Sequence, residues 1–293
     1  MRKSQIVWGT VLFIAVFVCG ICLGYLLNEN GKTQIQQSSE FQIRVTASSS
    51  SAIPSSAISS SEVTTASESE TETLSVQEDI WPDTGYNYLA IGNSITKHNI
   101  TSYWWNEIGM AASDADHDYF HIVLKSLEEE HADVKGLAFN LYGWESQSHD
   151  RDGALYLLDD YLSPNLDLVT VQLGENVDDL ATFQSDFLSL LLYIKTNAPN
   201  ARIIVIGDFW NKDNRNEMKE NVAKEANVDL VSLDGIASNP AYYRGLGSWV
   251  YDAEGNPHLV EHEGVAIHPG DAGMKAIADR IIAVLNEPAS NTA

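Results

Sequence analysis

The sequence contains very little cysteine and few basic residues. Its two cysteines, Cys19 and Cys22, both lie in an apolar stretch near the N-terminus, so the rest of the chain forms no disulfide. A folded domain there must be stabilised by its hydrophobic core. The 17 Lys and Arg residues are outnumbered by 41 Asp and Glu residues, which gives a net charge of −24. Because phosphate binding needs a basic surface, this balance argues against nucleic acid as a partner and disfavours strongly anionic substrates.

Only one long apolar run occurs, from Ile6 to Leu27, and it follows Arg2 and Lys3. As a helix it would be ~33 Å long, enough to cross the hydrocarbon core of a bilayer. It lacks an A-x-A-like cleavage site, so we expect an uncleaved transmembrane signal anchor at residues 6–27. The positive charges place residues 1–5 in the cytoplasm and the rest of the chain outside. Export without disulfides fits a single-pass protein of the cell membrane, with an extracellular C-terminal domain, in a Gram-positive bacterium.

Residues 28–79 are rich in Ser, Thr and Glu and contain runs of serine. Such a composition cannot bury enough apolar surface to fold. We therefore expect a disordered stalk between the membrane anchor and a folded domain at residues 80–290.

From about Trp81 onward, short apolar runs alternate with helical patterns. This alternation predicts one α/β domain, a three-layer α/β/α sandwich around a five-stranded parallel, flavodoxin-like sheet. The expected strands are Tyr86–Gly92, Lys135–Asn140, Leu166–Gly174, Arg202–Gly207 and Val228–Leu233. The expected helices are Asp118–His131, Gly153–Leu162, Thr182–Asn197, Glu217–Ala226 and Ala272–Leu285.

Polar residues follow several of these strands, where ligands bind in open parallel sheets. Ser94 follows the first strand, Asn176 follows the third, and His268 precedes the last helix. The three are therefore expected to meet at one edge of the sheet.

Three short motifs carry a family resemblance: Gly92-Asn93-Ser94, Gly174-Glu175-Asn176 and His268-Pro269. Their order and spacing resemble the SGNH hydrolase (GDSL-type esterase) superfamily, whose first block is usually Gly-Asp-Ser. The resemblance implies a serine esterase that needs no cofactor and no metal. Ser94 would be the nucleophile and His268 the base. The oxyanion hole would use the Ser94 N–H, the Asn176 amide and a backbone N–H of the second block.

The register of that second block is open. Its glycine falls either at Gly143 or, counted from Asn140, at Glu145. In the second case the Glu145 N–H would serve, and the Glu145 side chain would lie at the mouth of the pocket.

One family position departs from the pattern. The residue three positions before the base histidine is usually Asp, and here it is Val265. Two hypotheses follow. A backbone carbonyl near Val265 accepts the His268 N–H, which gives a Ser–His dyad. Alternatively, a nearby carboxylate orients the histidine, and the candidates are Glu263, Glu261, Glu145 and Asp271.

Two further groups of residues are candidates for ligand sites. His117 and His121, like His258 and His262, are four residues apart, but no His-Glu-x-x-His motif is present, so we expect solvated histidines and no metal. Tryptophans near the expected site suit sugar rings, although packing under loops explains them equally well. These candidate substrate-lining residues are Trp104, Trp105, Trp144 and Trp210.

The sequence thus predicts an extracellular serine esterase that removes O-acyl groups, above all O-acetyl groups, from a cell-surface glycan or a small ester. An O-acetyltransferase would use the same acyl-enzyme. A catalytically inactive glycan-binding module is the alternative of another class, suggested by Val265.

Overall fold

The computed structural model describes residues 80–147 and 150–289. The predicted membrane span at residues 6–27 and the predicted stalk at residues 28–79 lie outside them. Within the described part of the chain, no helix is long and apolar enough to cross a membrane.

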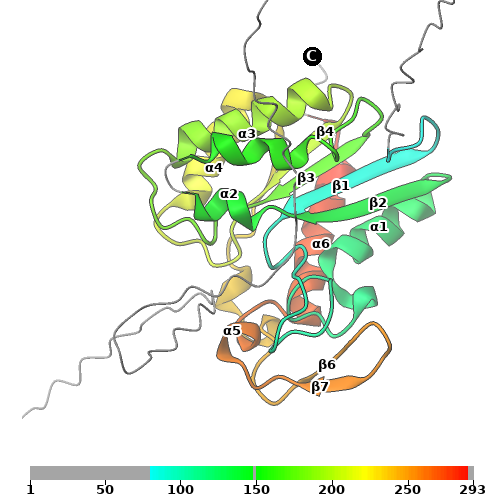
Figure 1. The fold of residues 1–293 in the computed structure, drawn as a ribbon, viewed down its shortest axis with the longest axis vertical. Helices are drawn as coiled ribbons and strands as arrows, with labels where there is room; N and C mark the ends of the chain where they lie inside the picture. The colour runs from blue at the N-terminus through cyan, green and yellow to red at the C-terminus, as the bar shows by residue number, and fades with distance from the viewer. Residues whose placement is uncertain (1–79, 148–149, 290–293) are drawn as a thin grey trace, which may run out of the picture. The chain divides into compact units, whose positions relative to one another are not determined.

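Five parallel strands form the central sheet, in the order β2-β1-β3-β4-β5 (Figure 1). This confirms the predicted α/β fold with a five-stranded parallel sheet. It is also the strand order of flavodoxin-like folds, in which ligands bind where the order reverses, at β1 and β3. The strands are β1 Tyr86–Gly92, β2 Val134–Asn140, β3 Leu168–Gln172, β4 Arg202–Ile206 and β5 Asp229–Val231.

Helices cover both faces of the sheet (Figure 1). Successive side chains of a strand point to opposite faces, and β1 shows this directly. Tyr88 and Ala90 belong to the core shared with α1 and α6, whereas Leu89 and Ile91 belong to the core shared with α3 and α4. All four are fully buried. The helices are α1 Tyr119–Glu130, α3 Phe183–Asn197, α4 Arg215–Ala226 and α6 Asp271–Leu285.

Several short elements were not predicted. The most important for the site is α2, Tyr142–Ser146, directly after β2. A hairpin of β6 (Trp249–Tyr251) and β7 (Pro257–Leu259) and the short helix α5 (Glu263–Ala266) lie together beyond the end of the sheet (Figure 1). The remaining elements are the 3₁₀ turns η1 Ala115–His117, η2 Asp152–Leu158, η3 Ile236–Ser238 and η4 Pro240–Tyr242.

The segment η2 replaces the predicted α-helix Gly153–Leu162. Its buried residues, Ala154, Leu155 and Leu158, produce the helical spacing in the sequence. Apolar residues three and four positions apart share one face in either helix type, so the pattern alone does not separate a 3₁₀ from an α-helix.

The turn after β1 requires a glycine. A Cβ at Gly92 would lie 1.8 Å from Thr96 Oγ1 and 2.9 Å from the Gln172 carbonyl oxygen. No larger residue fits there. Because position 92 is glycine, the chain can turn back sharply after β1 and place Ser94 at the edge of the sheet.

Candidate active site

The hydroxyl of Ser94 faces the imidazole of His268, with 2.9 Å between Oγ and Nε2. Ser94 lies in the turn that follows β1, and His268 lies just before α6. The turn is fixed by backbone bonds, because the Met110 N–H donates to the Ser94 carbonyl at 2.7 Å and the Thr96 N–H donates to the Asn93 carbonyl at 3.0 Å. The fold therefore brings together two of the three residues that the motifs selected.

The other ring nitrogen of His268 faces a backbone carbonyl. His268 Nδ1 lies 2.6 Å from the Gly264 carbonyl oxygen in α5. A carbonyl oxygen can only accept, so Nδ1 carries the proton and Nε2 presents its lone pair to Ser94. This geometry matches the backbone-carbonyl alternative of the two sequence hypotheses.

The carboxylate alternative has no matching contact among the described residues. Asp271 accepts the Ser113 N–H at 2.8 Å and pairs with Arg244, and Glu145 is bound elsewhere. Glu261 and Glu263 are exposed, and no hydrogen bond joins either of them to His268 in the described part of the chain. The expectation that one of these carboxylates orients His268 is therefore wrong for this structure. At the position where the family usually has Asp, Val265 is 1% exposed and packs in the core with α1 and α6.

Backbone bonds fix the segment that carries His268. The Arg244 N–H donates to the His268 carbonyl at 2.9 Å, the Gly245 N–H donates to the Ala266 carbonyl at 2.9 Å, and the Gly270 N–H donates to the Tyr242 carbonyl at 2.9 Å. The histidine is thus positioned by main chain on both sides.

Desolvation is the main cause that lowers the pKa of His268 to about 4; the Gly264 carbonyl opposes this shift, and the neighbouring His98 and His262 contribute to it. Trp210 closes one side of the ring at a centroid distance of 5.0 Å, edge to face. His268 is therefore neutral at neutral pH, which is the form that can accept a proton.

Asn176, the third motif residue, is held by a carboxylate. Its Nδ2 donates to Glu145 Oε2 at 2.7 Å. The Glu145 side chain is buried, with 1% of the residue exposed, and its Oε1 accepts the Gly174 N–H at 2.6 Å. The expectation that Glu145 lies at the pocket mouth is wrong, because α2 turns this side chain inward beneath the ends of β1 and β3. Gly143 lies in the same short helix, and its role as an oxyanion donor stays a prediction.

A buried group of charges lies beneath these residues, and sequence reasoning missed it. We call it the carboxylate network: Glu145, Glu175, Asp208, Arg215 and Lys219. Asp208 is fully buried and pairs with Lys219 and, at 2.6 Å, with Arg215. Glu175 Oε1 accepts the Phe209 N–H at 2.8 Å. Desolvation and then the charge of Asp208 raise the pKa of Glu175 to about 7, although Lys219 acts against the shift.

The first-block residue Asn93 joins the network to the nucleophile. It is fully buried, and its Oδ1 accepts the Ile95 N–H at 3.0 Å. Its Nδ2 donates to Glu145 Oε1 at 3.1 Å and to Glu175 Oε2 at 2.9 Å. An amide is required here, because a carboxylate would face two others.

The four tryptophans divide into two groups. Trp104 and Trp144 are fully buried, and Trp144 packs against Phe183 and Phe187 of α3. The prediction that these two line a substrate site is wrong; they are core residues under loops. Trp105 stacks on His258 of β7 at 4.4 Å, and Trp210 lies against His268.

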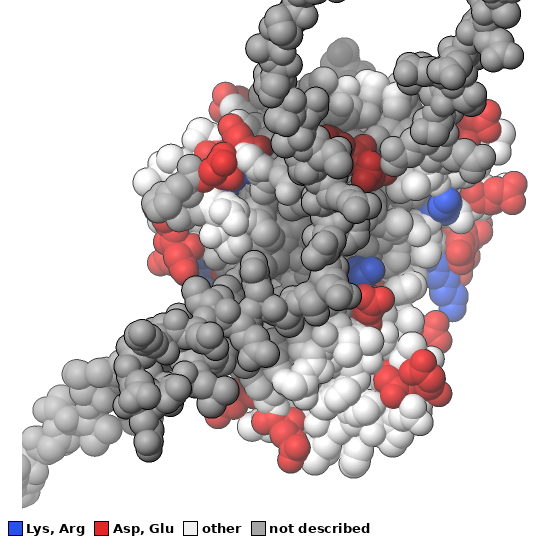
Figure 2. All heavy atoms as spheres, viewed as in Figure 1, with Lys and Arg blue, Asp and Glu red and all other residues white. Residues whose placement is uncertain are grey.

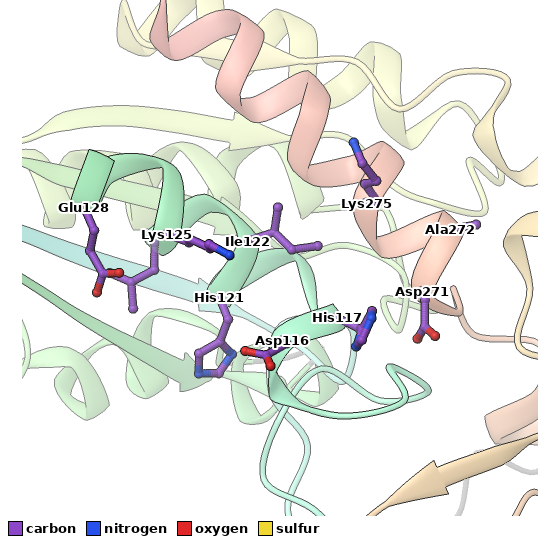
Figure 3. A pocket seen from close by; sticks show the side chains of 10 residues that line it. Asp116, His117, His121, Ile122, Lys125, Glu128, Asp271, Ala272 and Lys275 are labelled. Atoms are coloured by element: carbon purple, nitrogen blue, oxygen red, sulfur yellow. The ribbon is translucent and has the colours of Figure 1, made fainter. Parts of the chain in front are cut away.

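The paired histidines make separate local contacts. His117 Nδ1 lies 2.6 Å from Asp114, and His121 Nδ1 lies 2.8 Å from Asp118. Both line a hollow of about 680 Å³ between η1 and α1 on one side and α6 on the other, which does not include Ser94 (Figure 3). Among the residues that the structure describes, no group of three or more His, Cys, Asp or Glu could hold a metal ion.

The face seen in Figure 2 carries scattered acidic side chains and few basic ones. This distribution agrees with the charge balance of the sequence.

The domain combines a parallel sheet of order β2-β1-β3-β4-β5 with Ser94 after β1, Asn176 after β3 and a Ser94–His268 hydrogen bond. This is the arrangement that the resemblance of the three motifs to the SGNH hydrolases implies.

No family model and no curated protein matches the sequence. Solved structures that resemble this chain include a two-domain esterase active on acetylated mannans, at 17% identity, a TM-score of 0.45 and 69% coverage of this chain. The chain spans 49% of that esterase.

Two others are a putative GDSL-like lipase from Bacteroides ovatus and a salicylyl-acyltransferase from a tetracycline biosynthetic pathway. The lipase is 16% identical, with a TM-score of 0.45, 69% of this chain covered and 99% of that one. The acyltransferase is 15% identical, with a TM-score of 0.42, 69% of this chain covered and 56% of that one. At such identities and scores these likenesses carry no argument about the family or the activity of this chain.

Proposed function

We propose that this protein is a serine esterase that cleaves O-acyl esters through a covalent Ser94 intermediate. The observation that carries the proposal is the hydrogen-bonded relay from Ser94 Oγ to His268 Nε2 and from Nδ1 to the Gly264 carbonyl. A serine hydroxyl becomes a useful nucleophile when an adjacent base takes its proton. The fixed tautomer and the lowered pKa of His268 supply that base in its neutral form.

The reaction follows from these positions. Ser94 Oγ attacks the ester carbonyl carbon while its proton moves to His268 Nε2. In this proposal, backbone N–H groups and the Asn176 amide stabilise the oxyanion that forms. The bond to the alcohol oxygen then breaks, and His268 returns the proton to the leaving alcohol. Water repeats the same steps on the acyl-enzyme, which releases the carboxylic acid and restores Ser94.

We propose O-acetyl groups of a cell-surface glycan as the substrate class. The apolar run at residues 6–27 supports placement at the outer face of a membrane, where acylated glycans are the abundant esters. Trp210 supports a sugar substrate as well, because it is half-buried and its ring lies against His268.

The test is hydrolysis of p-nitrophenyl acetate and of acetylated glycans by the full chain. Ser94→Ala is expected to lower kcat/KM by at least ~10⁴-fold, since removal of a nucleophile leaves only binding and oxyanion stabilisation. Ser185→Ala is the matched control, because Ser185 is exposed on α3 and bonds only locally. It should match the unchanged protein.

Three outcomes separate the candidates. Hydrolysis that depends on Ser94 supports the esterase. Acetyl transfer that requires an added glycan hydroxyl, with little release to water, identifies the O-acetyltransferase. Glycan binding with no turnover and no labelling of Ser94 by a serine-directed phosphonate leaves the non-catalytic binding module and overturns the proposal.

A further inference from the structure

A single buried carboxylate joins three separate loops of the active site. Glu145 comes from α2, after β2. It accepts N–H groups from Asn93, after β1, and from Gly174 and Asn176, after β3. The loops that it joins are the ones that carry the nucleophile and the side-chain oxyanion donor.

Glu145 acts as an acceptor at both of its oxygens. Oε1 accepts the Gly174 N–H at 2.6 Å and Asn93 Nδ2 at 3.1 Å, and Oε2 accepts Asn176 Nδ2 at 2.7 Å. This is the pattern of an ionised carboxylate, since a protonated oxygen would have to donate. Desolvation raises the pKa of Glu145, and the hydrogen bonds from Asn176, Gly174 and Asn93 oppose the shift. Holding a charge in this position is costly, so the bonds that stabilise it also fix the donors in place.

The backbone at Gly174 shows how tightly this junction is built. Gly174 has a φ of 141°, and a Cβ there would lie 2.6 Å from Asp208 Oδ1 and 2.8 Å from the Lys219 side chain. Only glycine lets the chain pass over the carboxylate network and place Asn176 against Glu145. The orientation of the Asn176 amide is therefore fixed by its hydrogen bond to Glu145 and by the path of the backbone through Gly174.

We propose that Glu145 is a positioning residue for catalysis, which orients the Asn176 amide toward the oxyanion and ties it to the Asn93–Ser94 turn. The proposal rests on the proposed esterase function. It gives Glu145 a role that differs from both roles expected from the sequence, because its carboxylate contacts neither His268 nor the pocket mouth. The amide nitrogen of Asn176 carries two N–H bonds, so the bond to Glu145 can set the direction of the other.

The same arrangement explains why the first block has Asn93 where the family usually has Asp. Asn93 Nδ2 lies between Glu145 Oε1 and Glu175 Oε2. Two carboxylates below the turn require a donor above them, and like charges at this distance would repel in a buried site. The amide at position 93 is thus the hydrogen-bond donor that the carboxylate at position 145 requires.

The variant that tests the proposal is Glu145→Gln, which keeps the shape of the side chain. A Gln oxygen can still accept from Gly174 and Asn93, but its amide nitrogen then faces Asn176 Nδ2, donor to donor. We expect kcat to fall roughly 10–100-fold with KM nearly unchanged, because a misplaced oxyanion donor weakens the transition state more than substrate binding. Glu217→Gln is the matched control, an exposed glutamate on α4 that should leave both constants unchanged.

A double variant distinguishes positioning from general structural damage. Asn176→Ala alone is expected to lose ~10²–10³-fold in kcat. If Glu145 acts through Asn176, adding Glu145→Gln to Asn176→Ala should cost less than about threefold more, because the group being positioned is already gone. Multiplying losses would contradict the proposal, as would full kcat in Glu145→Gln.

Two further comparisons keep the result interpretable. If Glu145→Gln does not fold, as judged by its thermal unfolding, the same cycle is run with Glu145→Asp, which retains the charge and draws it back from Asn176. The parent protein is assayed beside Ser94→Ala throughout. Equal activity in those two refutes the esterase itself, whereas Ser94-dependent activity with additive Glu145 and Asn176 effects refutes only the positioning role.

Discussion

The two sides of the active site are held by different kinds of interaction. On the side of Ser94, buried carboxylates add to the backbone bonds of the turn, since Asn93 donates to Glu145 and Glu175 and Asn176 donates to Glu145. On the side of His268, the contacts come from the main chain. The imidazole is bonded to the Gly264 carbonyl, and its segment is held by backbone bonds to Arg244 and its neighbours.

This difference indicates that the oxyanion donors need charged hydrogen-bond partners, whereas the histidine does not. The donors that stabilise an oxyanion must be aimed, and buried carboxylates aim N–H groups strongly because charge-assisted hydrogen bonds are about twice as strong as neutral ones. The histidine needs only one acceptor in the right direction to fix its tautomer. A carbonyl can provide that acceptor without adding a full charge, so it stabilises the imidazolium less than a carboxylate would, and desolvation keeps the pKa of His268 low.

The largest effect on stability is expected on the Ser94 side. Asp208→Asn removes the charge that compensates the buried Lys219 and Arg215, and it should lower the free energy of unfolding by about 3–5 kcal/mol. Urea denaturation measures this. The control is Asp279→Asn, which breaks the exposed pair with Lys275 on α6 and should cost less than about 1 kcal/mol. Equal losses in the two variants would show that the carboxylate network contributes no special stability.

A smaller effect is expected when a carboxylate is added to the His268 side. Val265→Asp restores the acid that the family usually has, but Val265 packs in the core, so the substitution should lower the free energy of unfolding by about 2–4 kcal/mol. We expect no gain in kcat/KM, because His268 Nδ1 is already bonded to the Gly264 carbonyl.

Val265→Asn is the control for that experiment, since it differs from Val265→Asp in charge alone. A tenfold higher kcat/KM in the Asp variant than in the Asn variant would contradict the claim that the Gly264 carbonyl suffices to orient His268. It would mean that His268 lacks something that only a carboxylate supplies.

Much of the framework could be read from the sequence. The strand β1 matches its predicted limits. The five residues of β3 are all buried and lie within a predicted run, because apolar β-formers in a parallel sheet leave a continuous pattern. Ser94, Asn176 and His268 could be selected because strand ends and motif order placed them at one edge. These features depend on residues close together in the chain or on a fixed topology.

The supporting contacts could not be read in the same way. The helix α2 is too short to show a helical period, so the inward direction of Glu145 was invisible. The pairing of Asp208 with Lys219 joins the end of β4 to the middle of α4, which no local pattern records. Trp144 followed a strand end as a binding residue would, but packing against α3 buries it. Direction and burial come from tertiary packing rather than from spacing.

The most direct test of the account is the acid limb of the pH profile for kcat/KM on p-nitrophenyl acetate. The catalytic base is active when neutral, so a pKa of about 4 for His268 should place the midpoint of the rise near pH 4 and leave a level region from about pH 5 to 6.5. Circular dichroism at each pH verifies that the protein stays folded. A midpoint at or above ~6.5, the ordinary histidine value, would contradict a desolvated Ser94–His268 pair held by the Gly264 carbonyl alone.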